Sequence, residues 1–211
     1  MKKGRFITFE GGEGCGKSTQ IWRLESFLKE KGVEVLVTRE PGGTRLAEFI
    51  RGLLKDEKDD PPCDRAELLL FLAARAQLVK NVILPALESG VWVLSDRFSD
   101  STFAYQGYGR GLDLEILKIA NDFACDSLKP DLTLLLDVPA EVAASRMRKR
   151  ERETNTSADR IELAGDEFHL RLREGFRALA AAEPERIITV DASGTPDEVW
   201  EAVCRSLKHL I

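Results

Sequence analysis

Residues 11–18 combine glycines, a lysine and a serine in an order that suits the phosphates of a nucleoside triphosphate. They fit the pattern G-x-x-x-x-G-K-S/T, between an apolar run and an amphipathic run. Glycines let backbone N–H groups turn toward phosphate oxygens, and a helix opening at Lys17 adds its positive end. Lys17 is expected to reach the β- and γ-phosphates, and the Ser18 hydroxyl to help hold Mg²⁺. The predicted triphosphate loop comprises Gly11, Gly12, Glu13, Gly14, Cys15, Gly16, Lys17, Ser18 and Thr19.

This loop by itself does not separate kinases, GTPases, ATPase motors and inert nucleotide-binding modules. The chain has no Asn-Lys-x-Asp guanine motif, and its one plausible D-x-x-G (191–194) follows the last predicted strand. The Leu-Ser-Gly-Gly signature of transporter ATPases is also absent from the sequence. Within the loop, Cys15 is interpreted as a small space-filling residue, and a reactive thiol is the alternative.

A second chemical signal is the pair Asp96-Arg97, which follows the apolar run 91–94. Asp96 is placed to act on Mg²⁺ directly or through a water, and Arg97 to clamp a phosphate with two parallel hydrogen bonds. The alternative is an ordinary strand-end aspartate beside a surface arginine.

Short apolar runs alternate with segments of helical period, which predicts the elements that hold these residues. The runs 6–9, 33–37, 91–94, 132–136 and 187–190 are nearly continuous in apolar residues, as in strands covered on both faces. The pattern predicts an α/β fold with a five-stranded parallel sheet and helices on both faces. One long helix is expected to begin at Arg65, capped by Asp64, and to kink or end at Pro85. Ligands bind at the carboxyl ends of such strands, where charged residues follow: Glu10, Arg39, Asp96, Asp137 and Asp191.

Length and composition limit the class of protein. The 211 residues suggest one domain, 1–211, with a small mobile insertion. With 31 Lys and Arg against 36 Asp and Glu, a net charge of −5 argues against binding polymeric nucleic acid. The four scattered cysteines and two histidines suggest neither a zinc site nor a disulfide scaffold. The first apolar run is broken by Glu10, too soon for a signal peptide, and no apolar stretch approaches the ~18 residues of a membrane span. We expect a reduced, cytoplasmic protein with no membrane segment.

Several segments together resemble the thymidylate kinases, which phosphorylate dTMP with ATP. The similarity extends over essentially the whole chain and lies in residues 9–19, 38–44, 70–75, 96–107, 130–132 and 159–162. It implies a P-loop NTPase fold and the reaction dTMP + ATP → dTDP + ADP in dTTP biosynthesis, with Mg²⁺ and a homodimer. Two alternatives stay open: a P-loop kinase for another deoxynucleoside monophosphate, and a non-catalytic nucleotide-binding module.

The resemblance also implies a base and sugar pocket. Phe71 would stack on thymine, and Arg75, four residues later on the same helix face, would donate to the base O4. Tyr105 would pack below the sugar, where a ribose 2′-OH would clash. Thr102 and Gln106 would approach the base, with Ser101 beside them. An ordinary core role is the alternative for Phe71.

Further residues would hold the rest of dTMP. The resemblance assigns the 3′-OH to Glu13, for which a solvated loop carboxylate is the alternative. Glu40 and Pro41 would line the wall near Mg²⁺ and the sugar. The acceptor phosphate would be held by Arg39, Arg51 and Arg97, although an exposed helical Arg51 usually only faces solvent.

The basic stretch 146–152 has five cations in seven residues, within an acidic protein. A solvated helix end and a nucleic-acid patch are two interpretations. The third is a short mobile lid over the triphosphate, about 146–160, because an arginine near the transferring group is worth roughly 10³–10⁵ in rate. Some thymidylate kinases place that arginine in the P-loop, but the corresponding position here is Gly14, so the chain resembles the bacterial lid-arginine type. The candidates are Arg150, Arg152 and Arg160.

Overall fold

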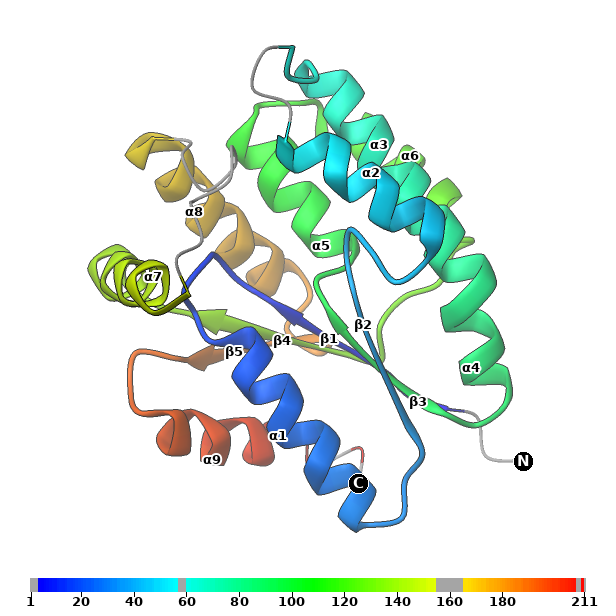
Figure 1. The fold of residues 1–211 in the computed structure, drawn as a ribbon, viewed down its shortest axis with the longest axis vertical. Helices are drawn as coiled ribbons and strands as arrows, with labels where there is room; N and C mark the ends of the chain where they lie inside the picture. The colour runs from blue at the N-terminus through cyan, green and yellow to red at the C-terminus, as the bar shows by residue number, and fades with distance from the viewer. Residues whose placement is uncertain (1–3, 57–59, 155–164, 208–209, 211) are drawn as a thin grey trace.

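The structure is a computed structural model that describes residues 4–56, 60–154, 165–207 and Leu210. One sheet of five parallel strands, in the order β2-β3-β1-β4-β5, runs through the middle of the molecule (Figure 1). Strand β1 lies between β3 and β4, with Phe6 opposite Val93 and Ile7 opposite Leu132. The predicted five-stranded parallel sheet with helices on both faces is therefore confirmed.

The described elements follow one another in regular strand–helix alternation. They are β1 (Phe6–Glu10), α1 (Lys17–Glu30), β2 (Val35–Arg39), α2 (Arg45–Asp56), α3 (Asp64–Leu78), the π-helix η1 (Val79–Ile83), α4 (Leu84–Glu88), β3 (Trp92–Asp96), α5 (Ser99–Thr102), the π-helix η2 (Phe103–Gly109), α6 (Leu114–Ala124), β4 (Leu132–Asp137), α7 (Ala140–Thr154), α8 (Asp166–Ala182), β5 (Ile187–Asp191) and α9 (Pro196–Ser206).

Two apolar layers enclose the sheet. On one face, α1 and α9 pack on the strands through residues such as Leu24, Leu28 and Val203. On the other face, α3, η1, α4 and α8 cover it, with Leu78 and Phe176 among the buried side chains (Figure 1). Because both faces are covered, the strands read as nearly unbroken apolar runs in the sequence. Because the five strands are parallel, their carboxyl ends and the polar residues there lie along the same edge of the sheet.

Some local expectations were wrong. Asp64 is the first residue of α3, Cys63 occupies the cap position, and no side chain caps the helix there. The helical run also continues beyond Pro85 to Glu88, through the π-helical η1. Pro85 lies in the first turn of α4, where the missing N–H costs little. No range was predicted for α2, although Arg51 was expected to be helical, and α6 was not anticipated.

One helical run bears on the expectation that no apolar stretch approaches the length of a membrane span. The run Asp64–Glu88 is long and apolar enough by length and composition, because it contains an 18-residue window with a mean hydropathy of 1.5. In this fold its apolar residues include Leu72, Leu78 and Ile83, which are buried against other elements. Core helices pass the same test, so the run is weak evidence for a membrane segment.

The predicted lid begins inside helix α7, which carries the basic stretch 146–152. Residues 155–160, including the candidate Arg160, lie outside the described residues. Whether 146–160 closes over a ligand therefore stays a prediction.

Candidate active site

A cleft of about 640 Å³ opens at the carboxyl ends of the strands. The P-loop, the turn after β2, helix α3, the turn after β3, and helix α7 all contribute to its wall. Among the residues predicted for the site, those lining it are Glu13, Gly14, Gly16, Lys17, Ser18, Thr19, Arg39, Glu40, Pro41, Arg51, Phe71, Arg75, Asp96, Arg97, Ser101, Thr102, Tyr105, Gln106 and Arg150. Residues from widely separated parts of the chain thus share one cavity.

Four predicted residues do not line this cleft. Gly11 and Gly12 belong to the loop but are not among the lining residues, and Cys15 is buried among apolar side chains. Arg152 is exposed on α7. Arg160 is not described.

The P-loop is shaped by its glycines and held by its lysine. Gly16 has φ +93° and immediately precedes α1, so this turn into the helix needs a residue that tolerates the left-handed region. The Lys17 Nζ donates to the carbonyl oxygens of Gly11 (3.1 Å) and Gly12 (3.0 Å). The lysine is thereby folded back over the loop, at the open N-terminus of α1.

Ser18 and Asp96 meet at the edge of this loop. The Ser18 hydroxyl lies 3.4 Å from the Asp96 carboxylate, to which it donates. In the described part of the chain, no group of three His, Cys, Asp or Glu residues could hold a metal on its own. One hydroxyl and one carboxylate nevertheless fit Mg²⁺, which binds few protein oxygens and takes the remaining ligands from phosphates and water.

Arg97 connects the P-loop with the turn after β3. Its Nη1 donates to the Gly11 carbonyl (3.0 Å) and to the Ser101 hydroxyl (3.3 Å), and its Nη2 pairs with Glu13. The guanidinium also lies 4.9 Å from the centroid of the Tyr105 ring. This arginine is therefore fixed between the two halves of the cleft.

Glu13 lies among cations. Burial opposes its ionisation, but Arg97, Lys17 and Arg150 outweigh burial and lower the pKa of Glu13 to about 2. The carboxylate is thus charged at any working pH. Here it pairs with arginines, so its predicted contact with a sugar hydroxyl stays a prediction.

Arg75 is a fully buried charge in the cleft wall, only 1% exposed. Its Nε and Nη2 donate to Glu40, Nη2 also to the Phe98 carbonyl, and Nη1 to Thr102 and Asn121. Burial disfavours its charge, but Glu40 outweighs burial and the pKa of Arg75 is raised. All five N–H groups already have protein partners, so a bond to a base oxygen requires that one of them be shared.

Gln106 is held by a carboxylate that the sequence did not reveal. Its Nε2 donates to Glu67 (3.0 Å), which also accepts from Arg110 and is 1% exposed. This bond engages one N–H of the Gln106 amide and orients it. The half-buried Phe71 packs beside helix α2 and lines the same wall.

The arginines at the rim are also oriented by neighbours. Arg39 pairs with Glu48 on α2 through 3.0 and 3.1 Å bonds, and Arg51 donates to the Pro41 carbonyl (2.9 Å). The turn after β2 therefore brings both cations toward one end of the cleft, where their role toward a phosphate stays a prediction.

Helix α7 crosses close above the P-loop. A side chain on Gly14 would meet the Ala143 carbonyl of α7 at 2.7 Å, and Gly14 has φ +71°. Arg150, from the same helix, lines the cleft, and its Nη1 lies 4.0 Å from the Glu13 carboxylate. Arg146 also lines the cleft, and its guanidinium donates to carbonyls of residues 192–194, after β5. Of the two described lid candidates, only Arg150 reaches the cleft.

Reasoning from the sequence missed three residues that support the site: Glu10, Glu67 and Asn121. Each is polar, nearly fully buried, and bonded to a residue of the cleft. Glu10 carried one signal, as a carboxylate at the end of a buried strand. The partners of Glu67 and Asn121 lie 39 and 46 residues away in the sequence, which no local pattern indicates.

Comparisons with known proteins agree with this geometry. A family model for thymidylate kinase matches residues 9–203. The thymidylate kinase of Nitratidesulfovibrio vulgaris is 51% identical over 98% of this chain and 97% of its own length. That of Synechococcus sp. is 52% identical over 94% of this chain and 93% of its own.

This chain belongs to the thymidylate kinase family.

A solved structure supports the same placement. The crystal structure of thymidylate kinase from Ehrlichia chaffeensis matches with a TM-score of 0.77 and 36% identity, covering 98% of this chain and 99% of that one. The predicted P-loop NTPase fold and kinase class, a phosphotransferase that uses ATP, are thus confirmed. Nothing in these comparisons favours the two alternatives raised from the sequence.

Proposed function

We propose that this thymidylate kinase family member transfers the γ-phosphate of ATP to the phosphate of dTMP, giving dTDP and ADP. One observation carries the proposal: a single cleft is lined by the P-loop lysine, Asp96, several arginines and an aromatic wall. Such a cleft suits two phosphates that must approach each other and a base that must be buried.

On the donor side, the backbone N–H groups of residues 11–18 and the N-terminus of α1 bind the triphosphate, and Lys17 neutralises it. Ser18 and Asp96 hold Mg²⁺. When bound, the metal ion neutralises negative charge on the phosphates.

On the acceptor side, Arg97 holds the dTMP phosphate, with Arg39 and Arg51 at the rim. No general base is needed, because the attacking group is already an ionised phosphate. Catalysis is then positioning and charge stabilisation by groups that are held in place beforehand. Arg150 supplies the lid cation that stabilises the transferring group.

The base and sugar are held by the inner wall. Phe71 stacks on thymine. Arg75 and Thr102, which are hydrogen-bonded to each other, also bond the O4 edge of the base. Because Glu67 occupies the Gln106 NH₂, the amide oxygen is left to accept from the base N3–H. Tyr105 closes the floor under the deoxyribose, against a 2′-OH, and Glu13 accepts from the 3′-OH beside Pro41 and Glu40.

We further propose a homodimer. Apolar side chains stand exposed on α3 and α6: Leu69 (64%), Ile116 (64%), Ile119 (71%) and Phe123 (90%). Spacing of three and four residues puts the last three on one face of α6. A second copy covering this face explains its apolar character, and Phe123→Glu should then shift a dimer to monomer in analytical ultracentrifugation. The enzyme acts in the cytoplasm, on free nucleotides, with neither polymeric nucleic acid nor a membrane as partner.

Turnover with a panel of acceptors tests the reaction. ADP release is measured with ATP and each of dTMP, dUMP, UMP, CMP, AMP and thymidine. We expect dTMP to be preferred, UMP to be poor, and thymidine to be inert because it offers no phosphate to the arginines. No turnover with any monophosphate would overturn the proposal in favour of a binding module.

A further inference from the structure

Glu10 is a buried carboxylate beside the P-loop that the mechanism above does not use. It is the last residue of β1, directly before Gly11, and it is 1% exposed. It does not line the cleft. A carboxylate buried at this point needs strong partners, because burial disfavours its charge.

Its hydrogen-bond partners lie in the turn that follows β3 and in helix α5. One Glu10 oxygen accepts from the backbone N–H groups of Phe98 (2.8 Å) and Ser101 (3.3 Å), and the other accepts from the Ser101 hydroxyl (2.6 Å). This turn leads into α5, whose cap residue Phe98 has no side-chain capping bond. Glu10 therefore does from a distant strand what a local capping side chain normally does.

The residue that this turn presents is Arg97, whose backbone has φ +75°. A non-glycine residue rarely adopts this left-handed conformation, because it brings Cβ too close to the following carbonyl oxygen. It is kept by bonds on both sides: the Arg97 N–H donates to Phe9 (3.0 Å), and the Ser95 hydroxyl donates to the Arg97 carbonyl (2.7 Å). At Phe98, the next residue, the backbone N–H donates to Glu10 and the carbonyl accepts from Arg75.

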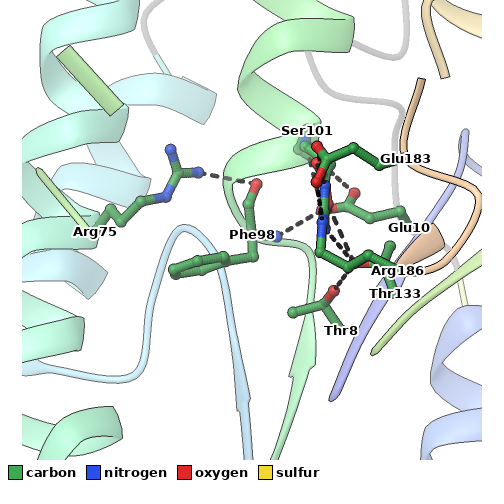
Figure 2. A network of polar contacts seen from close by, with 9 residues as sticks. Thr8, Glu10, Arg75, Phe98, Ser101, Thr133, Glu183 and Arg186 are labelled. Carbon is green, nitrogen blue, oxygen red and sulfur yellow. Dashed lines mark hydrogen bonds and ion pairs between the residues drawn. The ribbon is translucent and has the colours of Figure 1, made fainter. Parts of the chain in front are cut away.

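Figure 2 shows these two hydrogen bonds, with Arg75 and Glu10 on opposite sides of Phe98. A second route reaches the arginine side chain itself. The Ser101 hydroxyl donates to Glu10 and accepts from the Arg97 Nη1 (3.3 Å). Glu10 thus orients both the backbone and the guanidinium of Arg97.

We propose that Glu10 is a positioning residue for the acceptor phosphate: it holds the Arg97–Ser101 turn so that the Arg97 guanidinium is already in place when dTMP binds. The proposal rests on the role of Arg97 in holding the dTMP phosphate. It assigns to Glu10 the preorganisation that such a clamp needs.

Asp100 offers a matched control in the same network. It is also buried and belongs to α5, as Ser101 does, but its carboxylate accepts from Arg186 (2.7 and 2.8 Å) and Thr133 (3.2 Å). These bonds tie α5 to β4 and to the residue that precedes β5. No bond from the Asp100 side chain reaches Arg97 among the described residues.

The test compares the affinities for dTMP and thymidine, measured by calorimetry, in Glu10→Gln, Asp100→Asn and Arg97→Ala. In Glu10→Gln the amide still accepts from the backbone, but its NH₂ group cannot accept from Ser101. We expect about a tenfold loss of dTMP affinity and less than about a twofold loss for thymidine. Asp100→Asn should lower the melting temperature while leaving the ratio of the two affinities unchanged.

The outcomes separate this inference from the proposal on which it rests. Loss of dTMP affinity in Arg97→Ala but not in folded Glu10→Gln would overturn the role of Glu10 alone. No loss in either variant would overturn the role of Arg97 and this inference with it. An equal loss for dTMP and thymidine in Glu10→Gln would make Glu10 merely structural. If that variant does not fold, Ser101→Ala must show the same phosphate-selective loss in a smaller amount, or the proposal fails.

Discussion

The two sides of the cleft are built in different ways. The donor side is formed by the backbone of consecutive residues, 11–18, and by the start of one helix. The acceptor side is formed by side chains from distant elements, with buried charges such as Arg75, Glu40 and Glu67 bonded to one another or to the cleft residues. A backbone loop binds phosphate by its shape, whereas a side-chain network holds its ligand and its own fold with the same bonds. We therefore expect changes on the donor side to affect activity alone, and changes on the acceptor side to affect both activity and stability.

The largest effect on activity should come from Lys17→Ala. Removing the cation that faces the triphosphate should lower kcat by on the order of 10³-fold, in line with the loss of a preorganised donor. The fold should be retained, because the hydrogen bonds of the lysine side chain go to Gly11, Gly12 and Cys15, all within the loop itself. Steady-state kinetics and the free energy of unfolding, measured together, check both parts; full activity would overturn the assignment of the P-loop.

Next in size is the lid arginine, for which α7 offers a matched pair. Arg150 lines the cleft and Arg152 does not. Arg150→Ala should therefore lower kcat by roughly 10²–10³-fold, toward the lower end of what such arginines supply, and Arg152→Ala by less than about threefold. A larger loss in Arg152→Ala than in Arg150→Ala would contradict this choice.

On the acceptor side, Arg75→Ala should lower both the stability of the fold and the affinity for dTMP. It leaves Glu40 buried without its cation, so the free energy of unfolding should fall by about 3–5 kcal/mol. The affinity for dTMP should fall as well, by ~1–3 kcal/mol. Phe71→Ala, on the same helix but half-buried, serves as control: it should weaken dTMP binding with a smaller loss of stability. Chemical denaturation and dTMP titration of both variants measure these effects. An Arg75→Ala variant with unchanged stability and dTMP affinity would break the comparison.

The smallest expected effect is on the pH dependence of stability. Burial and the nearby Asp100 raise the pKa of Glu10 from 4.5 to about 7. The folded state then binds the proton more tightly than the unfolded chain, so the contribution of Glu10 is complete below about pH 4.5 and is lost as the pH rises to about 7. Glu13 has the opposite shift, and its contribution is lost only as the pH falls toward about 2.

Denaturation at several pH values between 4 and 8 checks this, since ~4–8 spans the titration of Glu10. Relative to wild type, Glu10→Gln should become more stable as the pH rises through this window, because it cannot titrate. A constant difference between the two proteins would contradict the raised pKa.

The same contrast explains what the sequence could and could not predict. The sheet and the P-loop follow from apolar runs and from one short motif, both of which are local. Similarity to known kinases supplied the acceptor residues, including Arg75, but not the partners that hold them. Glu67 and Asn121 became visible only when the fold brought α3, η2 and α6 together. The fixed backbone of Arg97 likewise depends on Phe9 and Glu10, which lie far from it in sequence.

We expect the acceptor side to be a preformed pocket for a pyrimidine deoxynucleoside monophosphate. Calorimetric titration of dTMP and of UMP into the protein without ATP tests it most directly. We predict that dTMP binds to one site per chain and that UMP binds at least about tenfold more weakly, because its 2′-OH meets Tyr105 and it lacks the thymine methyl group. Equal affinity for the two nucleotides, or no binding of dTMP until ATP is added, would contradict the account.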